Sequence, residues 1–468
     1  MPDSTQPVRN DAGIAHLLPL LAQRFGDRFS AGADIRRQHG HTTTWIENQP
    51  PDAVIFPTST GDVADIVRLA AEHRVPIIPF GTGTSLEGHV NAPHGGISID
   101  LSRMDNVLAI HAEDLDCVVQ PGVTRKALNA HLRDTGLFFP IDPGADASLG
   151  GMAATRASGT NAVRYGTMRD RVMALEAVLA DGRIIRTGTR ARKSAAGYDL
   201  TRLLVGSEGT LGIITELTLR LDGIPEKMAA ARAAFPNLKA ACDTVIATLQ
   251  YGLPIARIEL MDPAALAAVN AYSGLTLPEQ PSLLVEFHGS ETSVAEQSQT
   301  FVEIARDNGS TAFEATTRAE DRNRLWQARH DAYWAMVASR PGWESHSTDV
   351  CVPISRLADI VTATTERAAA QGIHAPILGH AGDGNFHALL LLPPEDPETR
   401  ARAKDMVTWM AETAVKMGGT ATGEHGIGQG KQDGLVNEAG AGLEVMQAIK
   451  QTLDPLNILN PGKIFAPR

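Results

Sequence analysis

The chain has 468 residues, of which 43% are apolar and 21% charged, and its formal net charge is −12. These values are typical of a globular protein with two or three domains, and they exclude broad nucleic-acid binding, which needs a basic surface. The three cysteines are scattered and odd in number, so neither a disulfide framework nor a thiolate zinc site is expected. No signal peptide or transmembrane segment is recognisable. We therefore expect a cytoplasmic protein, and peripheral contact with a membrane is compatible with this composition.

The first half of the chain alternates short strands with capped helices. An amphipathic helix is predicted over residues 14–26, and capped helices over 59–74 and 124–136. Apolar strands are predicted at 53–57, 75–80, 96–102, 117–122 and 211–221. This pattern predicts an N-terminal helical segment, residues 1–47, followed by an α+β domain over 48–224.

A link, "DGIPEKMA" at 222–229, leads into longer elements. A strand is predicted at 282–289, and helices over 355–372, with Ser355 as the cap, and over 397–419. Between these helices, "GHAGDGNFHALLLL" (379–392) has the apolar flanks and Gly/Asp/Asn turn of a β-hairpin. The segment 225–440 is therefore expected to form a second α+β domain.

Three glycine-dense stretches mark the first domain. "PFGTGTSLEGH" (79–89) follows a strand and offers N–H and hydroxyl donors that suit a diphosphate, although it fits neither the dinucleotide fingerprint nor the P-loop. A plain glycine loop explains this stretch equally well. The stretches 140–170 and 206–221 are also dense in glycine. Three such loops on one domain favour a large cofactor that carries a diphosphate.

These stretches resemble the flavin-binding domain of the vanillyl-alcohol oxidase and p-cresol methylhydroxylase superfamily. The resemblance implies a two-part FAD-binding domain of that type, an α+β substrate and cap domain, and a C-terminal segment, 441–468, that returns to the flavin. It implies noncovalent FAD, because "PFGTGTS" contains no histidine for attachment. The implied FAD-binding residues are Pro79, Gly81, Thr82, Gly83, Thr84, Ser85, Gly88, Pro143, Asp146, Gly150, Gly151, Ser158, Gly159, Tyr165 and Asn460 and, beside the nucleotide half of FAD, Glu208, Gly209, Gly212 and Ile213.

Two histidine-containing segments are candidates for a metal site. The predicted hairpin places His380 and His387 at one end of a strand pair, where two imidazoles can bind one metal, although ordinary turn-flanking histidines are the alternative. "GEHGIG" holds Glu424 and His425 between glycines. In an extended chain these neighbours point to opposite sides, so Glu424 could face a metal and His425 a substrate. An ordinary surface pair is the alternative.

With the flavin stretches, "GHAGDGNFH" and "GEHGIG" resemble the D-2-hydroxy-acid dehydrogenases of the same superfamily. "LWQARHDAYWA" resembles the arginine segment of that group, whereas on the residues alone Arg329 could be an exposed helical arginine. The resemblance implies a divalent metal (Zn, Mn or Fe) on His380, His387 and Glu424, His425 as the base, Asn385 beside substrate and flavin, and Arg329 as the clamp of the substrate carboxylate.

The implied reaction is oxidation of D-lactate, or a similar small D-2-hydroxy acid, to the 2-keto acid by hydride transfer to FAD. Electrons would pass to a cytochrome, a quinone or an electron-transfer flavoprotein. A 2-hydroxyglutarate enzyme and a glycolate oxidase flavin subunit are alternatives. A dicarboxylate would need a second cation, and Arg340 is the only arginine or lysine between Arg329 and Val352. Alternatives of other classes are a metal-dependent hydrolase and a non-catalytic flavoprotein.

Overall fold

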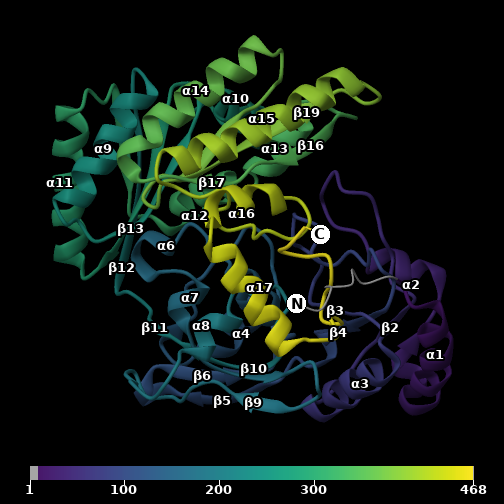
Figure 1. Cartoon of the computed structure of the whole chain (residues 1–468). Coiled ribbons are helices and arrows are strands. Elements are labelled where there is room, and N and C mark those ends of the chain that lie inside the picture. Colours follow the sequence, from purple (N-terminus) through teal and green to yellow (C-terminus); the bar gives the residue numbers. More distant parts are fainter. Residues whose placement is uncertain (1–8, 467–468) are drawn as a thin grey trace. The chain divides into compact units, whose positions relative to one another are not determined.

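The computed structural model describes residues 9–466, which form two compact units (Figure 1). Unit 1 comprises the described residues of 1–158, 167–224 and 424–468, and unit 2 comprises 159–166 and 225–423. This division differs from the expected domains in three places. The N-terminal helices belong to unit 1, the chain re-enters unit 1 at Glu424 instead of at residue 441, and the short segment 159–166 belongs to unit 2.

Unit 1 contains a four-stranded and a five-stranded sheet. The first has the order β1-β2-β4-β3, with parallel β2–β4 and β3–β4 pairs, and the second is antiparallel with the order β5-β6-β10-β8-β9. Its strands are β1 (Phe29–Ser30), β2 (Ala53–Ile55), β3 (Ile77–Phe80), β4 (Ile97–Asp100), β5 (Val107–His111), β6 (Asp116–Val119), β7 (Leu137–Phe138), β8 (Val172–Val178), β9 (Ile184–Arg186), β10 (Ile213–Arg220) and β11 (Asp222–Gly223).

The helices of unit 1 follow the sequence pattern closely. Helix α3 begins after Ser59, whose side chain accepts the N–H of Asp62, and its apolar stripe packs with α1 against the four-stranded sheet. The expected helix over 124–136 ends earlier, at Leu132. The helices are α1 (Asp11–Phe25), α2 (Ala33–Gln38), α3 (Thr60–His73), α4 (Arg125–Leu132), α5 (Leu149–Thr155), α7 (Met168–Arg171), α8 (Leu200–Leu204), α16 (Gln432–Ala439) and α17 (Gly442–Leu453).

The C-terminal segment packs onto the four-stranded sheet. The N–H of Ile77 donates to the carbonyl of Ile458 at 2.7 Å, and the N–H of Asn460 donates to the carbonyl of Ile77 at 2.8 Å. Ile458 and Leu459 are buried in the same core as α1 and α3. The end of the chain is therefore an extension of the edge formed by β3.

Unit 2 is built on an eight-stranded antiparallel sheet of order β15-β12-β14-β13-β18-β19-β16, with β17 also paired to β19. Its strands are β12 (Lys227–Ala234), β13 (Ile255–Met261), β14 (Ser282–Gly289), β15 (Ala312–Thr316), β16 (Glu344–Ser347), β17 (Val350–Cys351), β18 (Ile377–His380) and β19 (Asn385–Leu392). Its helices are α6 (Ala162–Tyr165), α9 (Leu238–Gln250), α10 (Pro263–Ser273), α11 (Glu291–Asp307), α12 (Ala319–His330), α13 (Ala332–Ala338), α14 (Leu357–Ala370) and α15 (Pro397–Lys416).

Two local expectations in unit 2 have different outcomes. The predicted hairpin forms, with β18 and β19 buried along their whole length. Ser355, in contrast, does not cap a helix. It lies inside a 3-10 turn, Ile354–Arg356, and α14 starts after it without a side-chain cap. Pro353 explains the tight turn, since its fixed φ suits the start of a helical segment.

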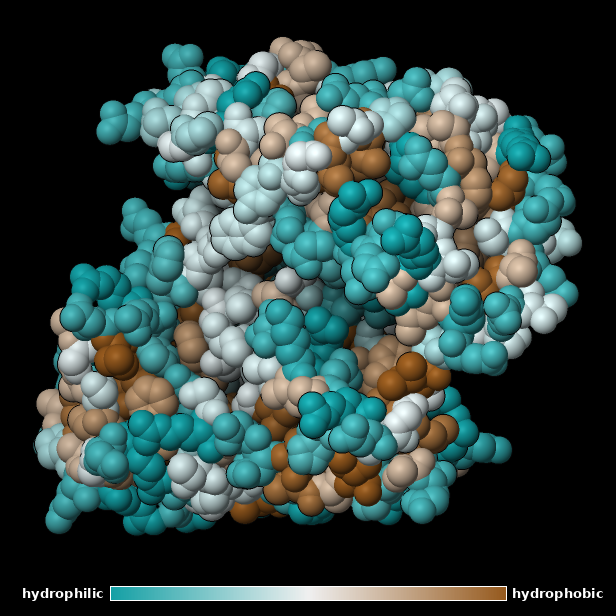
Figure 2. All heavy atoms as spheres, turned by 180° about the vertical axis from the view of Figure 1, so that it is seen from behind, coloured by the Kyte–Doolittle hydropathy of each residue, from teal (hydrophilic) through white to brown (hydrophobic). Residues whose placement is uncertain are grey.

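The surface seen in Figure 2 is mostly hydrophilic, and small apolar patches interrupt it. Within residues 9–466, no helix combines the length and the hydropathy that crossing a membrane requires.

Asp262 gives unit 2 a predicted pH dependence. Its buried side chain accepts the N–H of Ala265 at 2.7 Å and caps α10. Burial raises the pKa of Asp262 from 3.8 to about 6, although the N–H of Ala265 opposes this. Between these values the folded state binds more protons than the unfolded state, so stability falls as the pH rises.

Asp262→Asn keeps a good capping residue and removes the charge. We expect the free energy of unfolding of the variant, relative to the wild type, to rise by up to about 3 kcal/mol from pH 4 to pH 7. Thermal melts of both proteins across this range measure the effect. A difference that does not change with pH would contradict the expectation.

Candidate functional site

The three glycine-dense stretches meet within unit 1. A Cβ at Gly81 would collide with the hydroxyl of Ser148, and a Cβ at Gly209 would lie 2.8 Å from Cγ of Pro79. The first stretch therefore contacts both of the others at positions where no side chain fits. This close approach explains why glycine is used at 81 and 209, and it builds one cradle from segments far apart in the chain.

The cradle carries polar atoms that suit a diphosphate. The hydroxyls of Ser85 and Ser148 are buried and have no hydrogen-bond partner among residues 9–466. Thr82 and Thr84 precede Ser85 in the first stretch, and their hydroxyl oxygens lie 3.3 Å apart. Buried polar groups are rarely left unsatisfied, so donors placed here fit a ligand rich in acceptor oxygens, as FAD is. Ser148 was not among the predicted cofactor residues.

Several predicted cofactor residues also have contacts within the protein. Asp146 accepts from the hydroxyl of Thr124 and the N–H of Lys126, both at 3.2 Å, so it fixes the start of α4. Gly150 lies so close to Pro121 that a Cβ would collide with it. Of the others, Gly159 and Tyr165 belong to unit 2, whereas Pro143, Gly151, Ser158, Gly212 and Ile213 lie in unit 1.

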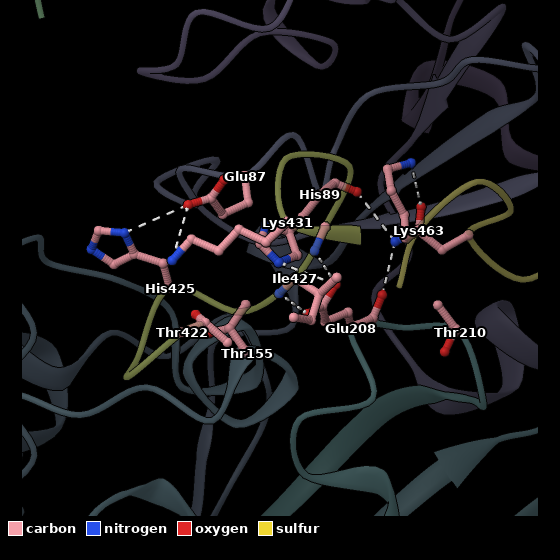
Figure 3. Close-up of polar contacts among 12 residues, drawn as sticks. Glu87, His89, Thr155, Glu208, Thr210, Thr422, His425, Ile427, Lys431 and Lys463 are labelled. Carbon is pink, nitrogen blue, oxygen red and sulfur yellow. Dashed lines mark hydrogen bonds and ion pairs between the residues drawn. The ribbon is translucent and has the colours of Figure 1, made fainter. Parts of the chain in front are cut away.

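Glu208, expected beside the nucleotide half of FAD, is bound to the C-terminal segment (Figure 3). One carboxylate oxygen accepts the N–H of Ile427 at 2.7 Å and the other accepts the N–H of Gly428 at 2.8 Å. The Nε2 of His89 lies 3.2 Å from the same carboxylate. Burial acts to raise the pKa of Glu208, but His89 and the two N–H groups outweigh it and the pKa is lowered. The carboxylate is therefore ionised at neutral pH.

Asn460, also predicted near the flavin, joins the same set of loops. Its amide donates to the carbonyl of Glu208 at 2.8 Å and to that of His89 at 3.2 Å. The ammonium of Lys463 donates to the carbonyl of Asn91 at 2.6 Å and to Oδ1 of Asn460 at 3.2 Å. The first and third glycine stretches are thus tied to the end of the chain.

In unit 2, the hairpin brings the two predicted histidines together. His380 pairs with Asn385 across the strands, and His387 pairs with Leu378, so His380 and His387 lie diagonally on one face. Their ring centroids are 5.5 Å apart, and both side chains are buried. The hairpin prediction is correct, although the two histidines are not directly opposite each other.

Each histidine has its Nδ1 held by an oxygen. The Nδ1 of His387 lies 2.9 Å from the carbonyl of Thr348, and the Nδ1 of His380 lies 2.7 Å from Oε1 of Glu259. A carbonyl can only accept, so Nδ1 of His387 carries a proton, and in the neutral ring the lone pair is on Nε2. The carboxylate favours the same tautomer in His380. Such contacts are typical of metal-binding histidines.

Glu259 connects His380 to Arg329. The Nε and Nη2 of Arg329 both donate to Oε2 of Glu259, the former at 3.0 Å. Burial acts to raise the pKa of Glu259, but the neighbouring His380 and Arg329 outweigh it and lower the pKa. Arg329 is itself only 7% exposed. It is not an exposed helical arginine, and half of its guanidinium is committed to Glu259.

Asn385 is the first residue of β19, not the tip of the turn, because its backbone already pairs with His380. Its amide nitrogen donates to Asp349 at 2.7 Å and to the carbonyl of Val350 at 2.9 Å. Its buried Oδ1 has no hydrogen-bond partner in the described part of the chain. That oxygen is a second candidate for ligand contact.

Glu424 and His425 begin the part of unit 1 that follows unit 2. Gly423, the last residue of unit 2, lies against Asn385 so closely that a Cβ would collide with its amide. The chain bends over 423–425 and is not extended, so the expected alternation of the two side chains does not apply. In unit 1, Nδ1 of His425 lies 3.8 Å from Oε1 of Glu87, and Nζ of Lys431 lies 3.6 Å from the same oxygen (Figure 3).

Sequence reasoning missed Glu259 and Glu87. Both carboxylates are almost fully buried, at 1% and 2% exposure. A detectable signal existed for Glu259, because an acidic residue stands in the mostly apolar strand "IARIELM". Glu87 lies among glycines and gives no such signal.

Two family models match the chain. Residues 51–188 match the family described as FAD binding domain, and residues 224–464 match FAD linked oxidases, C-terminal domain. Among solved structures, p-cresol methylhydroxylase with substrate bound is similar, with a TM-score of 0.78, 16% identity, and coverage of 97% of this chain and 98% of that one. At that identity the likeness concerns the fold alone.

Similar curated proteins extend over nearly the whole chain. A protein of Danio rerio named probable D-lactate dehydrogenase, mitochondrial, is 52% identical over 97% of this chain and 92% of its own length. A protein of Arabidopsis thaliana named D-lactate dehydrogenase [cytochrome], mitochondrial, is 47% identical over 96% of this chain and 80% of its own length.

Proposed function

The chain belongs to the FAD-linked oxidases, and on that premise we propose that it oxidises D-lactate, or a similar small D-2-hydroxy acid, to the 2-keto acid. The observation that carries the proposal is the buried chain Arg329–Glu259–His380. It holds a cation suited to a carboxylate next to an imidazole suited to a metal. A substrate with adjacent carboxylate and hydroxyl groups matches that pair.

The glycine cradle of unit 1 would hold FAD. The Ser85 and Ser148 hydroxyls would donate to the diphosphate, and the bare backbone at Gly81 would allow close approach. When bound, FAD supplies the two-electron oxidant for the substrate Cα–H bond.

His380, His387 and Glu424 would hold one divalent metal, of which Zn, Mn and Fe are the candidates. The Nδ1 contacts of the two histidines leave the lone pairs on Nε2. Glu424 directly follows Gly423, which packs against Asn385, the strand partner of His380. Chain continuity thus supports Glu424 as the third ligand. When bound, the metal polarises the 2-hydroxyl group of the substrate.

Arg329 would bind the substrate carboxylate through the edge of its guanidinium that Glu259 does not occupy. Glu259 keeps Arg329 oriented, so the carboxylate is bound in one geometry. Arg340 is exposed and stacks on Trp343, so it is not a second buried cation at the site. A monocarboxylate such as lactate is therefore favoured over 2-hydroxyglutarate.

His425 would accept the hydroxyl proton of the substrate at Nε2. Its Nδ1 is the nitrogen that faces Glu87, and a carboxylate on that side orients an imidazole. Asn385 would contact the substrate through Oδ1.

An external acceptor would complete the cycle. The sequence has only Cys117, Cys242 and Cys351, so it contains neither a haem-attachment motif nor a cysteine set for an iron–sulfur cluster. The Arabidopsis relative has cytochrome in its name. We propose a cytochrome as the acceptor, with a quinone and an electron-transfer flavoprotein as the competing candidates.

Stopped-flow flavin reduction with a panel of acids tests the substrate. We expect D-lactate to reduce the flavin at least 100-fold faster than L-lactate, glycolate or D-2-hydroxyglutarate, because a rigid clamp and base accept one enantiomer and one carboxylate. Faster flavin reduction by glycolate or D-2-hydroxyglutarate than by D-lactate would identify that acid as the substrate in place of D-lactate. A colourless protein with full hydrolytic activity would favour the metal-dependent hydrolase.

A further inference from the structure

We propose that Glu208 is a positioning residue that fixes the segment Glu424–Gly428, and that it does not bind the nucleotide half of the cofactor. The contact lies wholly within unit 1. The inference rests on the proposed function in one respect, since that function gives Glu424 and His425 their roles.

The carboxylate of Glu208 is used completely by the C-terminal segment and His89. Each oxygen accepts one consecutive backbone N–H, from Ile427 and from Gly428, at 2.7 and 2.8 Å. Two N–H donors on two oxygens fix the orientation as well as the distance of the segment. Hydrogen bonds to a buried carboxylate are also stronger than those between neutral groups.

The backbone at Glu208 is strained, and the neighbouring segments hold it. Its φ is +53°, an uncommon value for a residue with a side chain. Its N–H donates to the carbonyl of Ala154 at 2.9 Å, and its own carbonyl accepts from the amide of Asn460. Glycine would fit this backbone more easily, and it already occupies both 206 and 209. The two N–H groups that its carboxylate accepts explain why a glutamate, and not a glycine, occupies this position.

The glycines of "GEHGIG" let the backbone approach the same carboxylate closely. A Cβ at Gly426 would lie 2.8 Å from Oε1 of Glu208 and 2.8 Å from Nε2 of His89. A Cβ at Gly428 would collide with the carbonyl of Glu87, which accepts the N–H of Gln429 at 2.7 Å. The backbone therefore reaches Glu208 and Glu87 only because residues 426 and 428 have no side chains. His425, one residue before Gly426, is held by this arrangement.

The test compares the holoenzymes of Glu208→Gln and of a matched control, Glu216→Gln. Glu216 lies on β10, half buried and paired with Arg186, outside this contact. A glutamine at 208 can accept one of the two N–H groups but turns an NH₂ toward the other. The three measurements are FAD affinity, hydrogen–deuterium exchange of a peptide covering 424–430, and kcat and KM for D-lactate.

We expect Glu208→Gln to speed exchange of the 424–430 peptide and to lower kcat about 100-fold, with KM and FAD affinity changed less than about threefold. The control should change none of these. A tenfold loss of FAD affinity with unchanged exchange would assign Glu208 to the nucleotide and overturn the proposal, and so would the absence of any change.

If Glu208→Gln does not fold, Glu208→Asp keeps the charge but shortens the reach, and faster exchange of the same peptide is again required. The exchange and affinity measurements do not need D-lactate. A wild-type enzyme that is inactive with D-lactate would therefore refute the proposed function alone. Unchanged exchange in both variants would refute the role of Glu208 alone.

Discussion

Arg329→Met is expected to lower kcat/KM for D-lactate by about two to three orders of magnitude. Removing one partner of a buried charged contact costs about 2–5 kcal/mol, and each 1.4 kcal/mol is tenfold in rate. Arg329 is the buried cation beside the hairpin histidines, held through Glu259. Steady-state kinetics across D-lactate concentrations measure the loss.

Two further variants separate the loss of binding from instability. Arg340→Met removes an exposed arginine of the same unit and should leave kcat/KM within about twofold. Arg329→Met alone removes the arginine partner of the buried Glu259 carboxylate, and such a loss destabilises a fold by about 3–5 kcal/mol. The double variant with Glu259→Gln removes both charges, so its melting temperature should recover while its activity does not. Recovery of activity would show that Arg329 acts on stability only.

Metal removal is expected to lower D-lactate oxidation about a thousandfold or more and to leave the flavin bound. A bound metal contributes several kcal/mol by polarising the reacting oxygen, whereas the glycine cradle contains none of the three predicted metal ligands. His387→Ala should have the same effect, with metal lost in elemental analysis. His374→Ala, a half-buried histidine outside the predicted set, should keep its metal and activity.

Glu259→Gln should give an intermediate result, with metal affinity lowered about 10- to 100-fold, because it loosens His380 without removing a ligand. Full activity after verified metal removal would exclude the set of His380, His387 and Glu424.

Local features of the fold follow directly from the sequence. The capped helix α3 and the hairpin of β18 and β19 form where the pattern predicts them, since a cap and a turn involve only neighbouring residues. The pattern does not show, in contrast, that Asn385 already pairs with His380 as the first residue of β19. Pairing register within a hairpin depends on how both strands are buried, which the turn residues do not specify.

The partners of the site residues could not be predicted in this way. Glu259 lies 70 positions from Arg329 and 121 from His380, and Glu208 lies 220 positions from Gly428. Nothing in a single sequence indicates which buried carboxylate will meet which donor. Asp146 likewise accepts hydrogen bonds from Thr124 and Lys126, which lie 22 and 20 positions before it.

The sequence by itself determined the α+β class, the three glycine stretches, the histidine hairpin and the family resemblance, because each depends on residues close together in the chain. The tertiary structure decided that Glu259 joins Arg329 to His380 and that Glu208 holds the segment after His425. The physical reason is that a buried charge must be compensated where it lies. The compensating group is chosen by the packing of distant segments, and only the folded chain brings those segments together.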